Sequence, residues 1–379
     1  MEAIPFIDLK KQFLLLKPQM EKVLLDVAAG SHYIGGSEVG QLEKVLAEYV
    51  GVAECIGCAN GTDALTLPLL AWGIGPGEAV FCPSFTFIAT AEVVALRGAV
   101  PVFVDIDPRT FNMCPVDLEN KIEAVKKQGR LKPRAVIPVD LFGLPADFKS
   151  INEIARKHDL LVLEDAAQGF GGEIDGQKAA SFSGVGATSF FPAKPLGSYG
   201  DGGAIMTSDK SLAEVLRSLR GHGTGQSKYE HIRLGVNSRL DTLQAAVLLV
   251  KFSVFPQEIK ARRKVAEAYS ERLSPYVSVP EVPAGYGSSW AQYTVRVPAG
   301  KRDTLIKHLK EQGIPSNIYY PLGLHLQPAF ASYPGLGNCP ETEKACREVL
   351  SLPMHPYLDE PTLDRIAEAL ISGLTTEDL

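Results

Sequence analysis

The sequence predicts an α/β protein, with a large domain built on a mixed, mostly parallel sheet covered by helices and a smaller C-terminal α+β domain. Between about residues 50 and 250, short β-branched runs alternate with helical stretches. Several runs are apolar throughout, so both faces of the sheet are expected to be buried. The 379 residues are also too many for one core. We therefore expect a large domain over 1–250, including an N-terminal arm, and a small domain over 251–379.

The first part of the chain alternates regularly between strand and helix patterns. Its expected strands are short apolar runs, at 77–85, 100–107, 134–143 and 160–168. Its expected helices follow them with helical periodicity, at 61–74, 90–99 and 147–159. In such sheets ligands bind beyond the carboxyl ends of the strands, so the residues after each strand are the first candidates for a site.

The rest of the chain begins with strong helical signals and then changes character. Residues 237–255 predict one helix, which Pro256 interrupts or bends, and residues 256–273 continue as a charged amphipathic helix. The expected α+β domain follows, with a strand at 291–298, a helix at 301–313, a Pro/Gly-rich loop at 321–340 and a last helix at 362–374.

The composition excludes several classes of protein. Apolar residues make up 45% and charged residues 22%, as in ordinary globular proteins. The net charge of −6 argues against a general nucleic-acid role. The opening "MEAIPFIDLKKQ" lacks the apolar region of a secretory signal, and no apolar run approaches the length of a membrane span. Six scattered cysteines without a disulfide framework favour a cytoplasmic protein.

Three further patterns are weak signals. Cys55 and Cys58 have CxxC spacing, but no second pair completes a zinc site, and small buried strand residues are favoured over a redox motif. The glycines of 169–176 lack the helix of a dinucleotide fingerprint. His222 and His231 lie in a polar, glycine-rich loop without metal-ligand spacing, so we expect no metal and a flexible loop near the site.

Asp165 is the first candidate for chemistry. It follows the fully apolar strand of "LLVLEDAAQ", where a buried carboxylate is costly unless it has a partner. The pyridinium nitrogen of a cofactor would be such a partner, and the carboxylate would keep that nitrogen protonated. A helix N-cap or a buried salt bridge remains open as the alternative.

Two other strand ends carry residues suited to a flat, phosphorylated ligand. Gly61 and Thr62 follow a strand at the expected start of a helix, where N–H groups and the helix dipole favour a phosphate. Phe87 follows another strand and could stack on a heterocycle. Taken singly, the phosphate signal is weak beside ordinary helix capping, and core packing is the more common explanation of such a phenylalanine.

Lys194 is the fourth piece. It lies between Pro192 and Pro195 in "SFFPAKPLGSYGDGGAI", with glycines after it that allow close approach of a ligand. A lysine held near a carbonyl and partly desolvated forms Schiff bases. Ser189 could add a hydroxyl for the phosphate. A phosphate site, a stacking ring, a pyridinium carboxylate and a Schiff-base lysine together indicate pyridoxal 5′-phosphate (PLP).

With these residues the chain resembles the DegT/DnrJ/StrS type of PLP-dependent sugar-nucleotide aminotransferase, a fold-type I family. The resemblance is carried by "GTDAL", "FTFIATA", "VPVFVDID", "EDAAQ", "SFFPAKPLGSYGDGGAI", "GVNSRLDTLQAA" and "LSLPMHPYL", over nearly the whole chain. It implies an aminotransferase whose cofactor cycles between PLP and pyridoxamine phosphate, with L-glutamate as the amino donor.

The resemblance also assigns roles to single residues. It implies that Lys194 binds the cofactor, that Asp165 contacts its ring nitrogen and Gln168 its ring hydroxyl region, and that Phe87 stacks on the ring. It places the phosphate at Gly61, Thr62 and Ser189. Asn237, from "GVNSRLD", would reach the phosphate of the neighbouring subunit, which implies a homodimer with two shared sites.

The substrate follows less directly. Within the family, the chain is most similar to members that aminate UDP-2-acetamido-3-oxo-glucuronate at C3, for a surface polysaccharide or glycan. Arg239 would then bind a sugar or donor carboxylate. Tyr319 and Tyr320 lie in the segment that reaches over the partner's substrate, where those members have a histidine followed by a tyrosine, so the substrate stays open. A 4-keto sugar (perosamine-type) is the alternative.

Two other functions exist on the same fold. In the PLP dehydratases of this type, histidine replaces the lysine, whereas position 194 here is lysine. A regulatory protein that binds the cofactor or a nucleotide sugar without turnover is the second alternative, and the presence of all the expected reacting residues argues against it.

Overall fold

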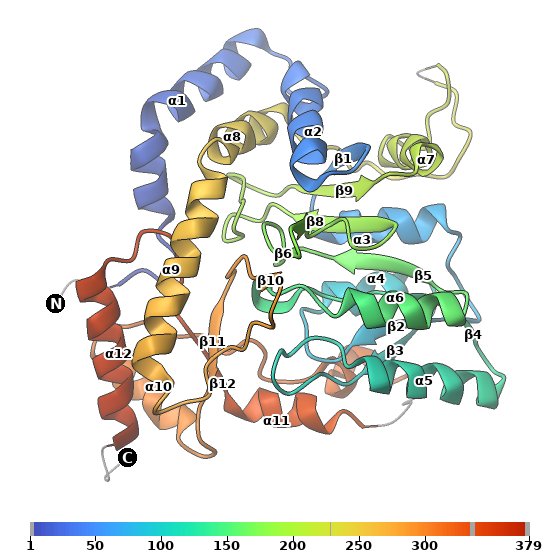
Figure 1. Ribbon diagram of the computed structural model, residues 1–379. Coiled ribbons are helices and arrows are strands. Elements are labelled where there is room, and N and C mark those ends of the chain that lie inside the picture. Colours follow the sequence, from blue (N-terminus) through green and yellow to red (C-terminus); the bar gives the residue numbers. More distant parts are fainter. Residues whose placement is uncertain (1–3, 228, 334–337, 376–379) are drawn as a thin grey trace.

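The computed structural model describes residues 4–227, 229–333 and 338–375. At its centre is a seven-stranded sheet with the order β1-β9-β8-β5-β4-β2-β3 (Figure 1). Neighbouring strands pair in parallel, except that β9 is antiparallel to both of its neighbours. The predicted mixed, mostly parallel sheet is therefore confirmed. Its strands are β1 (Glu54–Cys58), β2 (Glu78–Pro83), β3 (Val100–Val104), β4 (Lys132–Val136), β5 (Leu161–Asp165), β8 (Val185–Ser189) and β9 (Gly203–Thr207).

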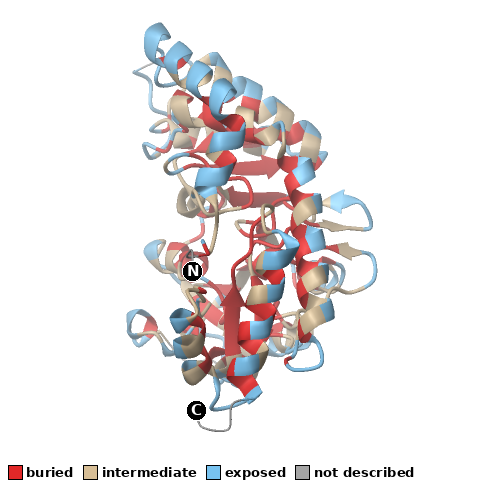
Figure 2. Ribbon diagram, turned by 90° about the vertical axis from the view of Figure 1, so that its left-hand side faces the viewer, coloured by how far each residue is buried: buried red, intermediate tan, exposed pale blue. Residues whose placement is uncertain are grey.

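Helices cover both faces of this sheet, which explains why its strands are apolar throughout. Val80 and Cys82 of β2 pack against helices on one face, and Ala79 and Phe81 pack on the other. In Figure 2 the buried strands run between helices whose outer sides are exposed. One face carries α3 (Gly61–Ala71), α4 (Ala89–Leu96) and α7 (Lys210–Arg220). The other carries α2 (Ser37–Val50), α5 (Pro115–Gln128), α6 (Phe148–Lys157) and α8 (Thr242–Phe252).

The helix predicted over residues 237–255 is shorter than expected. α8 begins at Thr242, and the residues before it are not helical, since Asp241 has an extended backbone. Ser238 explains this start, because its N–H donates to the Arg220 carbonyl (2.9 Å) and its hydroxyl accepts from the Ala59 N–H (3.2 Å). These bonds hold the segment against the sheet. Pro256 interrupts the helix as predicted and lies in the first turn of α9 (Phe255–Leu273).

A second hydrophobic cluster joins elements at the lower left of Figure 1, beside the sheet. It joins the later part of α9 to an antiparallel strand pair and two helices: β11 (Tyr293–Arg296), β12 (Val349–Leu352), α10 (Arg302–Glu311) and α12 (Glu360–Thr375). Phe255 and Ile259 belong to the core beside the sheet, whereas Val265 and Tyr269 belong to this second cluster. α9 therefore contributes to both cores, and the division at residue 250 remains a prediction.

The remaining elements flank these two cores. The long helix α1 (Leu9–Gly30) lies beside α8, away from the sheet (Figure 1). The others are the small sheet of β6 (Glu173–Ile174), β7 (Gln177–Lys178) and β10 (Tyr286–Gly287), the helix α11 (Pro340–Glu348), and the short helices Leu141–Gly143, Leu324–Leu326 and Pro328–Phe330. No helix in the described part of the chain is long and apolar enough to cross a membrane.

Candidate active site

The predicted cofactor residues lie at one end of the central sheet, after the carboxyl ends of its parallel strands. Asp165 is the last residue of β5, and Ser189 is the last residue of β8. Phe87 follows β2, and Gly61 and Thr62 begin α3 directly after β1. The topology therefore brings together four strand ends that are far apart in the sequence.

Asp165 is held in a defined orientation. Its side chain is buried; Oδ2 accepts a hydrogen bond from the Thr90 hydroxyl (2.8 Å), and Oδ1 accepts one from the Ala167 N–H (3.2 Å). Burial raises the pKa of the Asp165 carboxyl, while these donors and the charge of Lys194 oppose the rise. Thr90 has no role in the sequence-based prediction. The sequence shows only a hydroxyl in the first turn of an expected helix, and nothing in it links Thr90 to Asp165.

Lys194 lies in the turn after β8, where its N–H donates to the Phe191 carbonyl (2.8 Å). Burial lowers the pKa of its amine, and the Asp165 carboxylate opposes that shift. A lowered pKa increases the neutral, nucleophilic fraction of a lysine. The structure thus places a partly desolvated amine within the electrostatic reach of a buried carboxylate.

The start of α3 meets the end of β8. Asn60 caps this helix by accepting from the Asp63 N–H (2.8 Å), which leaves the N–H groups of Gly61 and Thr62 outside the helical ladder. A Cβ built on Gly61 would lie 2.5 Å from the Ser189 Cβ, so the two residues are in close contact. Two N–H groups and two hydroxyls consequently meet at one helix terminus, a donor set that suits a phosphate.

Gln168 lies three residues beyond Asp165 and is also held from two sides. Its Oε1 accepts from the Phe142 N–H (2.7 Å), and its Nε2 donates to the Tyr320 hydroxyl (3.2 Å). Burial raises the pKa of Tyr320, which keeps the phenol neutral. Tyr320 therefore contacts the predicted cofactor side of its own chain, and Tyr319 lies next to it, with its ring near Phe6.

Phe87 is not part of the hydrophobic core, since 57% of its surface is exposed. Core packing, the alternative for this residue, is thereby excluded. Asn237 and Arg239 are both exposed, on either side of the anchored Ser238. These two side chains are available to a neighbouring molecule.

The structure gives a structural account of the three weak sequence signals. Cys55 and Cys58 are free and buried in β1, and burial raises the pKa of both thiols, which opposes thiolate formation. The glycines of 169–176 lead into the β6–β7 hairpin and not into a helix. His231 Nδ1 contacts the His222 carbonyl (3.0 Å), and the described ranges contain no group of three or more side chains that could hold a metal.

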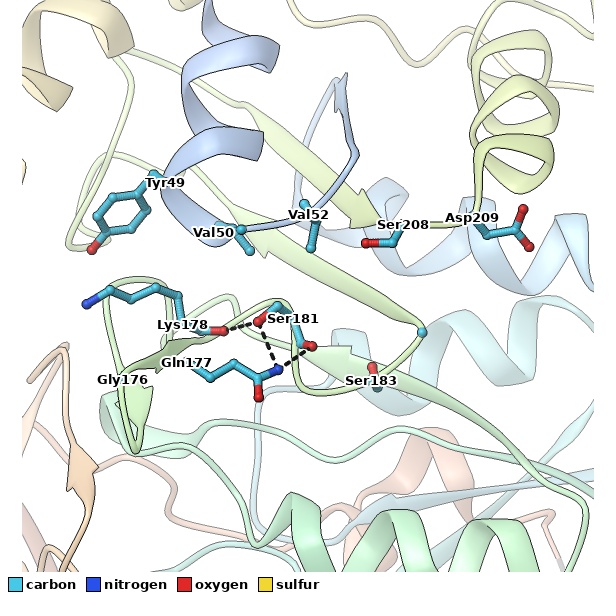
Figure 3. Close-up of a pocket in the computed structure, with 12 residues that line it drawn as sticks. Tyr49, Val50, Val52, Gly176, Gln177, Lys178, Ser181, Ser183, Ser208 and Asp209 are labelled. Carbon is cyan, nitrogen blue, oxygen red and sulfur yellow. Dashed lines mark hydrogen bonds between the residues drawn. The ribbon is translucent and has the colours of Figure 1, made fainter.

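An open hollow of about 560 Å³ lies elsewhere (Figure 3). Its lining includes Ser183 and Gly184, just before β8, and Ser208 and Asp209, just after the antiparallel β9. These positions mark the opposite edge of the sheet from Asp165. The hollow contains none of the predicted site residues.

The fold and this group of residues define a PLP-dependent aminotransferase, and comparison with known proteins narrows that class. The pattern of the DegT/DnrJ/EryC1/StrS aminotransferase family matches residues 16–371. The chain belongs to this family.

Several relatives are similar over almost their full length. The UDP-2-acetamido-2-deoxy-3-oxo-D-glucuronate aminotransferase of Pseudomonas aeruginosa is 47% identical, over 97% of this chain and 99% of that protein. A pleiotropic regulatory protein of Geobacillus stearothermophilus is 45% identical, over 97% of both chains. A DegT DnrJ EryC1 StrS aminotransferase from Brucella abortus, of known crystal structure, is 51% identical in sequence. Its structure matches with a TM-score of 0.96, over 98% of this chain and 100% of that one.

The cofactor of this chain is PLP. A Bacillus subtilis protein that is 28% identical, with a TM-score of 0.86 over 99% of this chain and 86% of its own, has been crystallised with bound cofactor PMP, the amine form. The residues described above fit the group, because donors suited to a phosphate, a buried carboxylate and a partly desolvated lysine lie at the same end of the sheet.

Proposed function

We propose that Lys194 and Asp165 carry the catalysis and that the residues around them hold the cofactor. The observation that carries this proposal is the desolvated amine of Lys194 beside the buried carboxylate of Asp165. When bound, the cofactor supplies an electron-accepting ring. With the cofactor bound, the Lys194 amine would take up and return the proton of the amino donor's Cα, as general base and acid. Asp165 keeps the ring nitrogen protonated.

The other contacts orient the cofactor. Gly61, Thr62 and Ser189 bind its phosphate through two backbone N–H groups and two hydroxyls. Phe87, exposed at the sheet edge, stacks on the ring. Gln168 contacts the ring hydroxyl, since Phe142 and Tyr320 already hold its amide in one orientation.

The proposed reaction transfers an amino group from L-glutamate to a nucleotide-linked keto sugar, UDP-2-acetamido-3-oxo-glucuronate at C3. The Pseudomonas relative, named for this substrate, supports the assignment. Arg239 suits a carboxylate because its guanidinium donates two parallel hydrogen bonds. Tyr319 and Tyr320 would complete the sugar site, with Tyr320 also holding Gln168. Such a product would serve surface polysaccharide or glycan synthesis.

We further propose that the enzyme is a cytoplasmic homodimer. Asn237 and Arg239 are exposed in the single chain, which fits a role in the site of a partner. The free cysteines of the described residues are in keeping with a reducing compartment.

One relative favours a second function, since it is named as a pleiotropic regulatory protein. A regulator that only binds the cofactor would not need a lysine with a lowered pKa in electrostatic contact with a carboxylate. The paired residues Lys194 and Asp165 therefore favour turnover. A 4-keto sugar remains the alternative substrate, because rotating the sugar offers either carbon to the same amine.

The deciding experiment follows the visible absorbance of the purified yellow protein. UDP-2-acetamido-3-amino-glucuronate should convert the cofactor from its aldehyde to its amine form, by the reverse half-reaction, and glutamate should do the same. The matching 3-amino sugar without the carboxylate tests Arg239. Conversion by glutamate and 4-amino sugars alone would replace the proposed substrate, and no conversion with any amine would favour the regulatory function.

Lys194→Ala is the matched variant for this experiment. It should bind the cofactor but show no turnover, because the proton-transferring amine is missing. Normal activity of Lys194→Ala would contradict the proposed mechanism.

A further inference from the structure

The buried carboxyl of Asp140 lies next to the segment that carries Asp165 and Gln168. It has no part in the function described so far. It follows β4, the neighbour of β5 in the sheet, and its side chain is fully buried. Its N–H donates to the Asp165 carbonyl (3.1 Å), and the Asp165 N–H donates to the Pro138 carbonyl (2.9 Å). These two backbone hydrogen bonds therefore fix the position of Asp165 at the end of β5.

The Asp140 side chain also organises the turn that holds Gln168. Its Oδ1 accepts from the Ala146 N–H (3.1 Å), which closes the turn over residues 141–146. Within this turn, Phe142 directs its N–H to Gln168 Oε1 (2.7 Å). A change at Asp140 is thus transmitted to the amide that faces the cofactor.

Gly169, the residue after Gln168, has no side chain and therefore leaves space for the Asp140 carboxyl. A Cβ built on Gly169 would lie 2.3 Å from both Cβ and Oδ2 of Asp140. Only glycine leaves room for this contact, so the Asp140 carboxyl lies directly against the segment that carries Asp165 and Gln168.

The lack of a donor to the second carboxyl oxygen of Asp140, among the described residues, indicates that this carboxyl is protonated. Among the described residues, no N–H or hydroxyl donates to the buried Oδ2. Its carboxyl neighbour, Glu164, already accepts from the backbone N–H groups of Ala180 and Phe182, which favours the charged form of Glu164. Two buried carboxyls in contact are stable when one of them holds a proton and donates it to the other.

The electrostatic surroundings agree with a proton on Asp140. Burial and the charge of Glu164 raise the pKa of Asp140 well above its ordinary value. Burial raises the pKa of Glu164 to about 7, with the two N–H donors and the hydrogen bond from Asp140 opposing the rise. The titratable groups that face Asp140 are Glu164 and Asp165, from β5, and Tyr286, from β10.

We propose that Asp140 is a positioning residue, whose neutral carboxyl donates to Glu164 while its backbone and its other oxygen hold Asp165 and Gln168 against the cofactor. This inference rests on the proposed roles of Asp165 and Gln168. It assigns no contact between Asp140 and the substrate, so its effect is expected on cofactor binding and on the pH dependence of stability.

The test compares Asp140→Asn with Asp140→Ala and uses Asp303→Asn, an exposed position, as the control. The first readout is the dissociation constant of PLP, measured by absorbance titration of the cofactor-free protein. Asparagine can donate to Glu164 and accept from Ala146, so Asp140→Asn should stay within about twofold of wild type. Asp140→Ala leaves both partners unpaired and should weaken binding by about tenfold or more.

The second readout is the melting temperature of the cofactor-free protein from about pH 5 to about pH 8. The folded protein retains the Asp140 proton after the unfolded chain has lost it, so this group lowers stability as the pH rises. Asp140→Asn should therefore gain stability relative to wild type with increasing pH, and Asp303→Asn should not.

Two results would overturn the inference. If Asp140→Asn binds PLP as weakly as Asp140→Ala, the native carboxyl is ionised; if Asp140→Ala binds like the control, Asp140 positions nothing. Should Asp140→Ala fail to fold, Asp140→Asn and its pH profile still decide. A wild-type protein without turnover would contradict the proposed function alone, because neither readout depends on turnover.

Discussion

Asp165 and Lys194 depend on each other electrostatically, yet burial is the larger effect on both. It raises the pKa of the carboxyl and lowers that of the amine, whereas their mutual attraction acts in the opposite direction. Thr90 and the Ala167 N–H compensate the carboxylate by hydrogen bonding. In the proposed mechanism, the carboxylate of this pair would suit a cationic ring nitrogen, and the lowered pKa would increase the neutral fraction of the amine.

Asp165→Asn separates this role from a structural one. Asparagine keeps the shape and can still accept from Thr90, but it carries no charge to hold the ring nitrogen protonated. We expect the rate of transamination to fall by about a hundredfold or more, with little change in the melting temperature. An unchanged rate with a lowered melting temperature would instead support a buried salt bridge.

Single residues show which parts of the candidate site could be predicted from the sequence. Asp165 was recognisable because it follows a fully apolar strand, and Lys194 because of its prolines and glycines. Asp140 follows an apolar run in the same way, and only its contact with Gly169 distinguishes it from an ordinary turn residue. Thr90 could not be linked to Asp165, since the two lie 75 residues apart and meet only when β2 and β5 enter one sheet.

At the scale of elements, the junction of α3 with β8 sets the size of the phosphate site. Gly61→Ala would bring its Cβ to 2.5 Å from that of Ser189. Relieving this overlap costs about 1–3 kcal/mol, so we expect cofactor binding to weaken by about tenfold, as measured by absorbance titration.

Gly40→Ala is the matched control for Gly61→Ala. Gly40 lies within α2 with open space around a built Cβ, so alanine should stabilise the helix by about 0.5–1 kcal/mol without affecting the cofactor. Equal cofactor affinity in the two variants would show that the α3–β8 contact does not shape the site.

A second element-scale prediction concerns acid stability where the N-terminal segment meets the second core. His355 is buried, and burial with the nearby Arg262 lowers its pKa to about 4. Because the unfolded chain binds the proton first, stability is lost as the pH falls from about 6.5 to about 4, by up to about 3 kcal/mol. His355→Gln should reduce this loss in urea unfolding followed over the same pH range. An identical pH profile in wild type and variant would rule His355 out as its source.

At the scale of the whole molecule, the polar segment that carries Asn237 and Arg239 also exposes several large apolar side chains. Leu234 is 94% exposed and Tyr229 84% exposed, and Ile232 lies between them. Apolar side chains grouped in this way indicate a surface that another molecule covers. In the proposed homodimer, a second copy of the chain covers this surface, and both polar residues lie at a shared site.

Mixing two inactive variants tests this arrangement. Lys194→Ala and Arg239→Ala should each be inactive as homodimers. In a shared-site dimer, equal mixing with subunit exchange should restore about a quarter of the wild-type activity, because half of the dimers are mixed and each has one intact site. No recovery, despite proven exchange of subunits, would mean that each site is built within one chain.

The sequence by itself determined the class of fold, the chemistry and its place at the strand ends. These properties are local: apolar runs without alternation predict buried strands, and the residues that follow them are read directly. Tertiary structure alone decided which ends meet. Gln168 and Tyr320 form a hydrogen bond although 152 residues separate them. Ser189 contacts Gly61, and the hydrogen bonds of Ser238 shorten α8. No periodicity records such contacts, since they depend on the order of strands in the sheet and on the path of the chain between its two cores.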